Sequence, residues 1–174
     1  MCHVLVNVEK GTAELPFPSK NVLVCPRETQ WLRGFSVAEE HNHWHENGVK
    51  VISGDHLDTN TAQTPGMNRA AAINLATAGA QKLWAGTVQI HADAKTGAHH
   101  HGDLESIIYI ISGKARMRWG EKLEYVAEAG PGDFIFVPPY VPHQEINAND
   151  DEPLNCVLVR SGQDPVVVNL DIPV

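Results

Sequence analysis

The chain has 174 residues, 43% of them hydrophobic, with 13 Lys plus Arg against 21 Asp plus Glu, which gives a formal net charge of −8. This length suits one domain with a substantial core, and the acidic balance argues against a nucleic-acid or anionic-membrane surface. Three cysteines, Cys2, Cys25 and Cys156, form no close pair, which argues against a disulfide framework.

The N-terminus lacks the basic region of a signal peptide. No segment approaches the ~18 apolar residues that a membrane helix requires. We therefore expect a cytoplasmic protein whose partner is a small molecule.

We expect residues 1–80 to form an N-terminal extended arm and a partly irregular extension. This segment should pack on the barrel formed by residues 81–174. Short apolar runs at 4–8 and 22–25 alternate with glycine and proline. Such an arm could cover a sheet edge or pair with a second subunit. Residues 69–80 fit a helix or a strand. The cluster of His41, His43 and His45 lacks a distant fourth ligand, which favours a solvated loop.

From residue 82 the sequence predicts successive strands at the spacing of an all-β sandwich or barrel. Residues 104–111 are apolar on both faces, so one face lies in the barrel and the other against a second surface. That surface could be the arm, a partner subunit or both, and we expect a homodimer. Strand parity sends Arg116 and Arg118 to solvent, which argues against a substrate-carboxylate clamp at these two residues.

A candidate metal site begins at His99 and His101, which share one face of a strand because they are two residues apart. Glu105 has the same parity, and His143 would complete the set. This mixture of nitrogen and oxygen ligands suits one divalent transition metal, with manganese, iron, nickel and zinc all admitted.

Residues 132–147, Gly-Asp-Phe-Ile-Phe-Val-Pro-Pro-Tyr-Val-Pro-His-Gln-Glu-Ile-Asn, resemble the second cupin motif, and residues 99–113 resemble the first, His-x-His followed by Glu and a turn glycine. The resemblance implies a double-stranded β-helix, a form of jelly-roll barrel, with a metal near its axis. Carried over by position, it implies the ligands His99, His101, Glu105 and His143.

Three departures from the motifs stand out. Asp93 occupies the first glycine position of the first motif, and Tyr140 replaces a glycine of the second. Seven residues, rather than the usual six, separate Glu105 from Gly113, which predicts a shifted turn or a bulge.

Two further side chains are candidates for catalysis. Glu145 shares the parity of His143 and could be a general base or could orient an imidazole, or it could lie past the inner section of the strand. Tyr109 shares the parity of Glu105 and could supply a proton or an aromatic wall, although core packing is the favoured interpretation. The strand-like surroundings of Cys156 favour a buried structural thiol.

Three functions remain open. Four protein ligands leave two positions of an octahedral metal open, which suits a metal-dependent oxidoreductase of dioxygenase type acting on a small organic molecule. The alternatives are a non-oxidative isomerase, epimerase or lyase that uses the metal as a Lewis acid, and a non-catalytic small-molecule-binding protein. We favour the oxidoreductase. The fold alone does not choose among them.

Overall fold

The computed structural model describes residues 48–173, which lie within one compact unit. The apolar runs at 4–8 and 22–25 and the cluster of His41, His43 and His45 lie outside the described residues. No helix among the described residues is long and apolar enough to cross a membrane.

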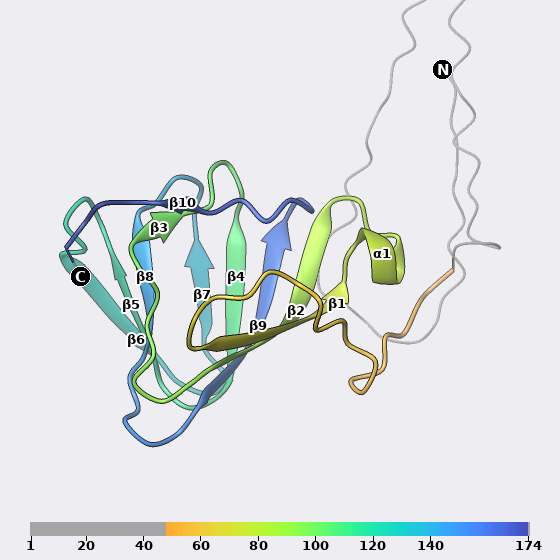
Figure 1. Cartoon of the computed structure of the whole chain (residues 1–174), viewed down its shortest axis with the longest axis horizontal. Coiled ribbons are helices and arrows are strands. Elements are labelled where there is room, and N and C mark those ends of the chain that lie inside the picture. The colour runs from red at the N-terminus through yellow and green to blue at the C-terminus, as the bar shows by residue number, and fades with distance from the viewer. Residues whose placement is uncertain (1–47, 174) are drawn as a thin grey trace, which may run out of the picture. The chain divides into compact units, whose positions relative to one another are not determined.

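Two five-stranded antiparallel sheets form the layers of a jelly-roll barrel (Figure 1). The first sheet has the order β1-β2-β9-β4-β7, and the second has the order β10-β3-β8-β5-β6. The first contains β1 (Met67–Ile73), β2 (Leu83–Ile90), β9 (Leu154–Ser161), β4 (Ser106–Ser112) and β7 (Phe134–Val137). The second contains β10 (Val168–Asn169), β3 (His99–His100), β8 (His143–Asn147), β5 (Ala115–Trp119) and β6 (Tyr125–Ala129). The prediction of an all-β cupin or jelly-roll barrel is confirmed.

The core lies between the two sheets, because alternate residues of each strand point inward. On β9 the buried positions are Leu154, Cys156, Leu158 and Arg160. Burying each aliphatic side chain contributes roughly 1.5–3 kcal/mol. The thiol of Cys156 donates to the carbonyl of Val88 at 3.6 Å, and burial raises its pKa to about 12, as suits a structural cysteine. Arg160 is the one charged residue in this inward row of β9.

Strand β4 has apolar residues on both faces, as its sequence predicts. Ile108 and Ile110 are buried in the core, whereas Ile107 and Ile111 are exposed on the outer face of the first sheet. On β5, Arg116 is half exposed, and its Nη2 lies 2.8 Å from Oε1 of Glu128. Arg116 therefore pairs with a neighbouring strand on the outside of the second sheet.

Residues 69–80, which fit a helix or a strand by sequence, contain one of each. Strand β1 pairs with β2 and ends at Ile73, and the short helix α1 (Leu75–Ala78) follows. Asn74 caps the helix by accepting from the Thr77 N–H at 2.8 Å, and Gly79 ends it with a left-handed φ of 74°. The expected boundary at residues 80 and 81 falls between α1 and β2, and β1 on its N-terminal side already belongs to the first sheet.

Candidate metal centre

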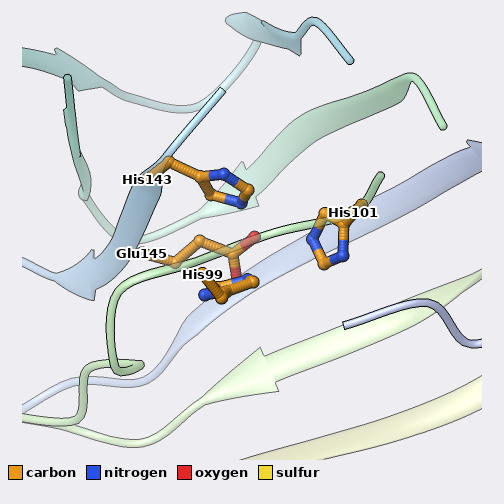
Figure 2. A group of neighbouring side chains, drawn as sticks. All are labelled: His99, His101, His143 and Glu145. Atoms are coloured by element: carbon orange, nitrogen blue, oxygen red, sulfur yellow. The ribbon is translucent and has the colours of Figure 1, made fainter. Parts of the chain in front are cut away.

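The centre is built where β3 and β8 lie side by side. His99 on β3 pairs in register with His143 on β8, and the residues two positions further along each segment are His101 and Glu145. Because residues two apart share a face of a strand, all four side chains point into the barrel. Their ligand atoms lie within 4.8 Å of one another. Figure 2 shows the three imidazoles and the carboxylate directed toward a common point.

Hydrogen bonds to the backbone orient each imidazole. The Nδ1 atoms of His99, His101 and His143 lie 2.9, 2.8 and 2.9 Å from the carbonyl oxygens of Gly97, Val166 and Val141, respectively. A carbonyl oxygen only accepts, so each Nδ1 carries the proton and each neutral ring keeps a lone pair on Nε2. This arrangement is typical of metal-binding histidines. Nε2 of His143 is buried and has no hydrogen-bond partner among the described residues.

The protonation states suit metal binding. Burial and the nearby Arg160 charge lower the pKa of His101 to about 3. Burial also lowers the pKa of His143, although the charge of Glu145 opposes this effect. Burial disfavours the Glu145 carboxylate, but the positive charges that surround it, those of His143 and His99 when protonated and that of Arg69, outweigh burial and hold its pKa below the usual value. Neutral imidazoles and an ionised carboxylate are the forms that bind a divalent metal.

The backbone of Glu145 is held in place from the loop that precedes β3. Its N–H donates to the Thr96 hydroxyl at 3.0 Å, and its carbonyl accepts from the Thr96 N–H at 2.9 Å. The neighbouring Gln144 is fully buried and donates to the Thr96 carbonyl at 2.8 Å. These bonds fix the backbone at Glu145, so its Cα–Cβ bond points toward the imidazoles.

Arg160 is a further component of the centre. Its Nε donates to the Ser106 hydroxyl at 3.0 Å, and its Nη2 lies 3.0 Å from Nε2 of His101. Because Nδ1 of His101 carries the proton, Nε2 accepts this second bond. That nitrogen has a single lone pair, so a metal bound there would compete with the guanidinium for it.

The structure brings together three of the four expected ligands and places Glu145, not Glu105, beside them. Glu105 is exposed, and its N–H donates to the Ser161 hydroxyl at 2.9 Å. The reason is the turn after β3: Gly102 has a left-handed φ of 62°, and the Leu104 N–H bonds back to the His101 carbonyl. This turn resets the strand parity, so β4 begins with an inward Ser106. The extra residue between Glu105 and Gly113 is placed elsewhere: the pairing of β4 with β9 shifts register between Ile110 and Ser112, as the seven-residue spacing predicts.

The other sequence candidates are placed as follows. Glu145 was expected as a base or an orienting residue and lies inside the ligand group itself. Tyr109 lies among the outward residues of β4, and its ring packs against Phe134 with the centroids 4.7 Å apart, away from the cluster. Sequence reasoning missed Arg160 and Ser106. The strict alternation of residues 154–161 was the available signal, because it places an arginine at an inward position.

A cavity of about 400 Å³ adjoins the centre at His143. Met117, Trp119, Ile135 and Val137 contribute apolar side chains to its lining. A volume of this size accommodates a compact organic molecule. The centre therefore has an apolar space beside one of its unpartnered nitrogen atoms.

The sequence model of the cupin domain family matches residues 86–160. No curated protein sequence matches the chain. Among solved structures, the polyketide cyclase RemF from Streptomyces resistomycificus is 20% identical with a TM-score of 0.61, covering 72% of this chain and 87% of that chain.

Two further solved structures share the fold. A conserved protein with a double-stranded β-helix domain from Klebsiella pneumoniae is 17% identical, with a TM-score of 0.54 and coverage of 71% of this chain and 98% of that chain. Oxalate decarboxylase from Bacillus subtilis, described for its Mn(II) centres, is 22% identical with a TM-score of 0.54. That match covers 65% of this chain and 30% of the decarboxylase chain.

Proposed function

We propose that this chain, which belongs to the cupin superfamily, is a divalent-metal-dependent enzyme that acts on a small organic molecule, and that it is an oxidoreductase of dioxygenase type. The observation that carries the proposal is the set of three imidazoles, each fixed through Nδ1, whose Nε2 atoms face the Glu145 carboxylate. The buried Nε2 of His143, which has no partner among residues 48–173, supports a ligand at this point.

His99, His101, His143 and Glu145 would hold the ion. Imidazole and carboxylate ligands suit manganese, iron, nickel or zinc, and the Mn(II) centres of oxalate decarboxylase support testing manganese early. Bound iron or manganese would supply redox chemistry, whereas zinc or nickel would act as a Lewis acid. The protein itself contributes fixed ligands and the apolar cavity at His143, which would bind the body of the substrate and exclude water.

The small number of acid and base side chains near the centre, among the described residues, favours the oxidoreductase over a Lewis-acid enzyme. Isomerases and lyases of that kind need a general base that is free of the metal. Among residues 48–173, the cluster contains one carboxylate, Glu145. Tyr109 packs away from the centre, and the thiol of Cys156, with a pKa of about 12, stays protonated.

In a second candidate function, Glu145 is not a metal ligand. Three histidines alone can hold a divalent ion, and the ionised Glu145 carboxylate would then be the general base of an isomerase, epimerase or lyase. The low pKa of Glu145 supports an ionised form at neutral pH.

The test uses tag-free protein purified without added metal. We expect elemental analysis to find about one equivalent of iron or manganese, and an oxygen electrode to record uptake that depends on a member of a panel of small acids, diketones and phenols. His143→Gln is the matched variant, which should lose both metal and uptake while keeping its circular dichroism spectrum. Zinc or nickel with turnover but no oxygen uptake would support the second candidate, and wild-type protein that takes up no metal after loading would refute both.

We also propose that the protein acts as a homodimer. The support is the apolar outer face of the first sheet, where Ile107 on β4 pairs across the ladder with Phe136 on β7 and both side chains are exposed. Exposed apolar patches on a folded protein mark interaction sites.

A further inference from the structure

Two arginines line a cleft to which the proposed function assigns no role. The cleft has a volume of about 440 Å³ and is lined by parts of β1, β2 and β9 and by the segment that follows β9. Arg69 and Arg160 supply its positive charges, Trp84 and Leu158 supply apolar walls, and Asp164 is its one acidic lining residue. Asp164 is exposed, so its charge is screened by water.

Both arginines point inward, which is unusual for a charged side chain. Arg160 is only 8% exposed, and Arg69 lies between the buried residues Met67 and Ala71 on the same face of β1. Nε of Arg69 is buried and has no hydrogen-bond partner among residues 48–173. The ion pairs within that range join Glu128 to Lys114 and Arg116, so neither inward arginine is paired with a carboxylate there.

The two guanidinium groups repel each other in a poorly solvated place. Burial lowers the pKa of Arg160, and the charge of Arg69 adds to this effect while Glu145 opposes it. Two like charges in such a place are costly unless anions compensate them. The Glu145 carboxylate attracts both guanidinium groups, but it supplies one negative charge against two positive charges. A planar carboxylate is the anion that a guanidinium fork binds best.

We infer that this cleft binds the carboxylate of the substrate through Arg69 and Arg160, so that the substrate class is a small organic acid. The inference rests on the proposed function and names its substrate. Nη2 of Arg160 lies 3.0 Å from Nε2 of His101, which places the bound carboxylate next to the metal centre.

The competition at His101 links the two sites. In this structure, Nη2 of Arg160 uses the lone pair of His101 Nε2. A metal bound to that nitrogen would take the lone pair, and Nη2 of Arg160 would then also be free to donate to a carboxylate. Without a metal, the donors to the carboxylate are the other N–H groups of Arg160 and those of Arg69. The Arg160 Nε remains held by the Ser106 hydroxyl, which keeps the group at the boundary between cleft and centre.

Calorimetric titration of the full chain with malonate tests the inference, with the neutral malonamide as the comparison ligand. Metal-free protein is measured first, because malonate can itself chelate a metal. We expect wild-type protein to bind malonate and to bind malonamide at least ten-fold more weakly. Arg69→Gln should weaken malonate binding roughly ten-fold or more, since it removes a charge-assisted hydrogen bond to the carboxylate, and Arg69→Lys should restore part of the loss.

Arg116→Gln is the matched control, because it removes an arginine that is half exposed and paired with Glu128. It should bind malonate as the wild type does. The melting temperature of each variant shows whether it is folded, and Arg69→Lys keeps the charge if Arg69→Gln fails to fold. Equal malonate affinity in wild type and Arg69→Gln, or equal affinity for malonate and malonamide, would overturn the inference.

Metal content measured on separate samples of the same protein, purified without added metal and then loaded with manganese, separates this inference from the proposed function. Protein that holds no metal but binds malonate through Arg69 would refute the metal-dependent enzyme and leave the anion site standing. Protein that holds metal but whose malonate affinity does not depend on Arg69 would do the reverse.

Discussion

At the scale of single residues, the sharpest question is which carboxylate would bind the proposed metal. Glu145 lies in the cluster, whereas Glu105 is exposed outside it. We expect Glu145→Gln to lower metal content strongly and Glu105→Gln to leave it unchanged, because an amide supplies no negative charge to the ion. Elemental analysis after loading with manganese and gel filtration measures both.

The same pair of variants also separates two roles of Glu145. If Glu145→Gln keeps its metal but loses activity, the carboxylate is a base and not a ligand. If Glu105→Gln is the variant that loses metal, the carboxylate assignment made from the structure is refuted in favour of the one made from the sequence motif.

His101 predicts a pH dependence of stability in metal-free protein. Its pKa is about 3 in the folded chain against 6.5 as the ordinary value, so between these two pH values the unfolded chain binds a proton that the folded chain excludes. The stabilising contribution is therefore complete above pH 6.5 and is lost as the pH falls toward 3. The free energy of unfolding should drop by about 1.4 kcal/mol per pH unit from this residue.

Urea denaturation at pH 7, 6 and 5 checks the slope. His101→Gln should reduce the slope without abolishing it, because burial also lowers the pKa of His143. His56→Gln, which changes an exposed histidine, should leave the slope unchanged. An identical slope in wild type and His101→Gln would contradict the assignment.

At the scale of secondary-structure elements, the contact between β1 and β2 supports the wall that carries Arg69. Gly86 on β2 lies so close to β1 that an added Cβ would collide with the Ala70 carbonyl oxygen and with the Trp84 ring. Gly86→Ala should therefore lower the free energy of unfolding by about 1–3 kcal/mol, as is usual when a packed site is overfilled.

Gly130→Ala is the matched control for Gly86→Ala. A Cβ at Gly130 would meet nothing within 4 Å, and its φ lies outside the left-handed range. Chemical denaturation should give this variant a stability within about 0.5 kcal/mol of the wild type. Equal stability of the two variants would mean that β1 moves away from β2 at little cost.

At the scale of the whole molecule, the outer face of the first sheet predicts the homodimer. Phe134 and Phe136 on β7 are 70% and 57% exposed, and Ile107 and Ile111 on β4 lie on the same outer face. A two-fold interface uses one patch from each copy, so a single apolar face is sufficient. Light scattering coupled to gel filtration should report twice the mass of one chain.

Phe136→Glu should shift that mass to one chain, because it places a charge in the interface. Val126→Glu is the control, since Val126 is 54% exposed on β6 of the other sheet. A wild-type protein that is already monomeric would contradict the prediction, as would dissociation caused by Val126→Glu alone.

Much of the fold and part of the candidate site could be predicted from the sequence because strand parity is local. A period of two places His99 and His101 on one face, and the spacing of the cupin motifs led to His143. The same period buries Ile108 and Ile110 and leaves Ile107 and Ile111 exposed on the opposite face. It also places Arg116 on the outer face of its sheet.

Only the tertiary structure decided which carboxylate and which arginines accompany the histidines. The alternation of inward and outward side chains does not continue from one strand to the next across a turn. After the turn at residues 101–104, the Glu105 side chain points outward and the Ser106 side chain points inward. The carboxylate beside the histidines is therefore that of Glu145. Arg69 and Arg160 come from β1 and β9, and their shared cleft depends on pairing β1 with β2 and β2 with β9. Such pairing is a long-range property, because its register is set by packing of the whole sheet and not by the residues of one strand.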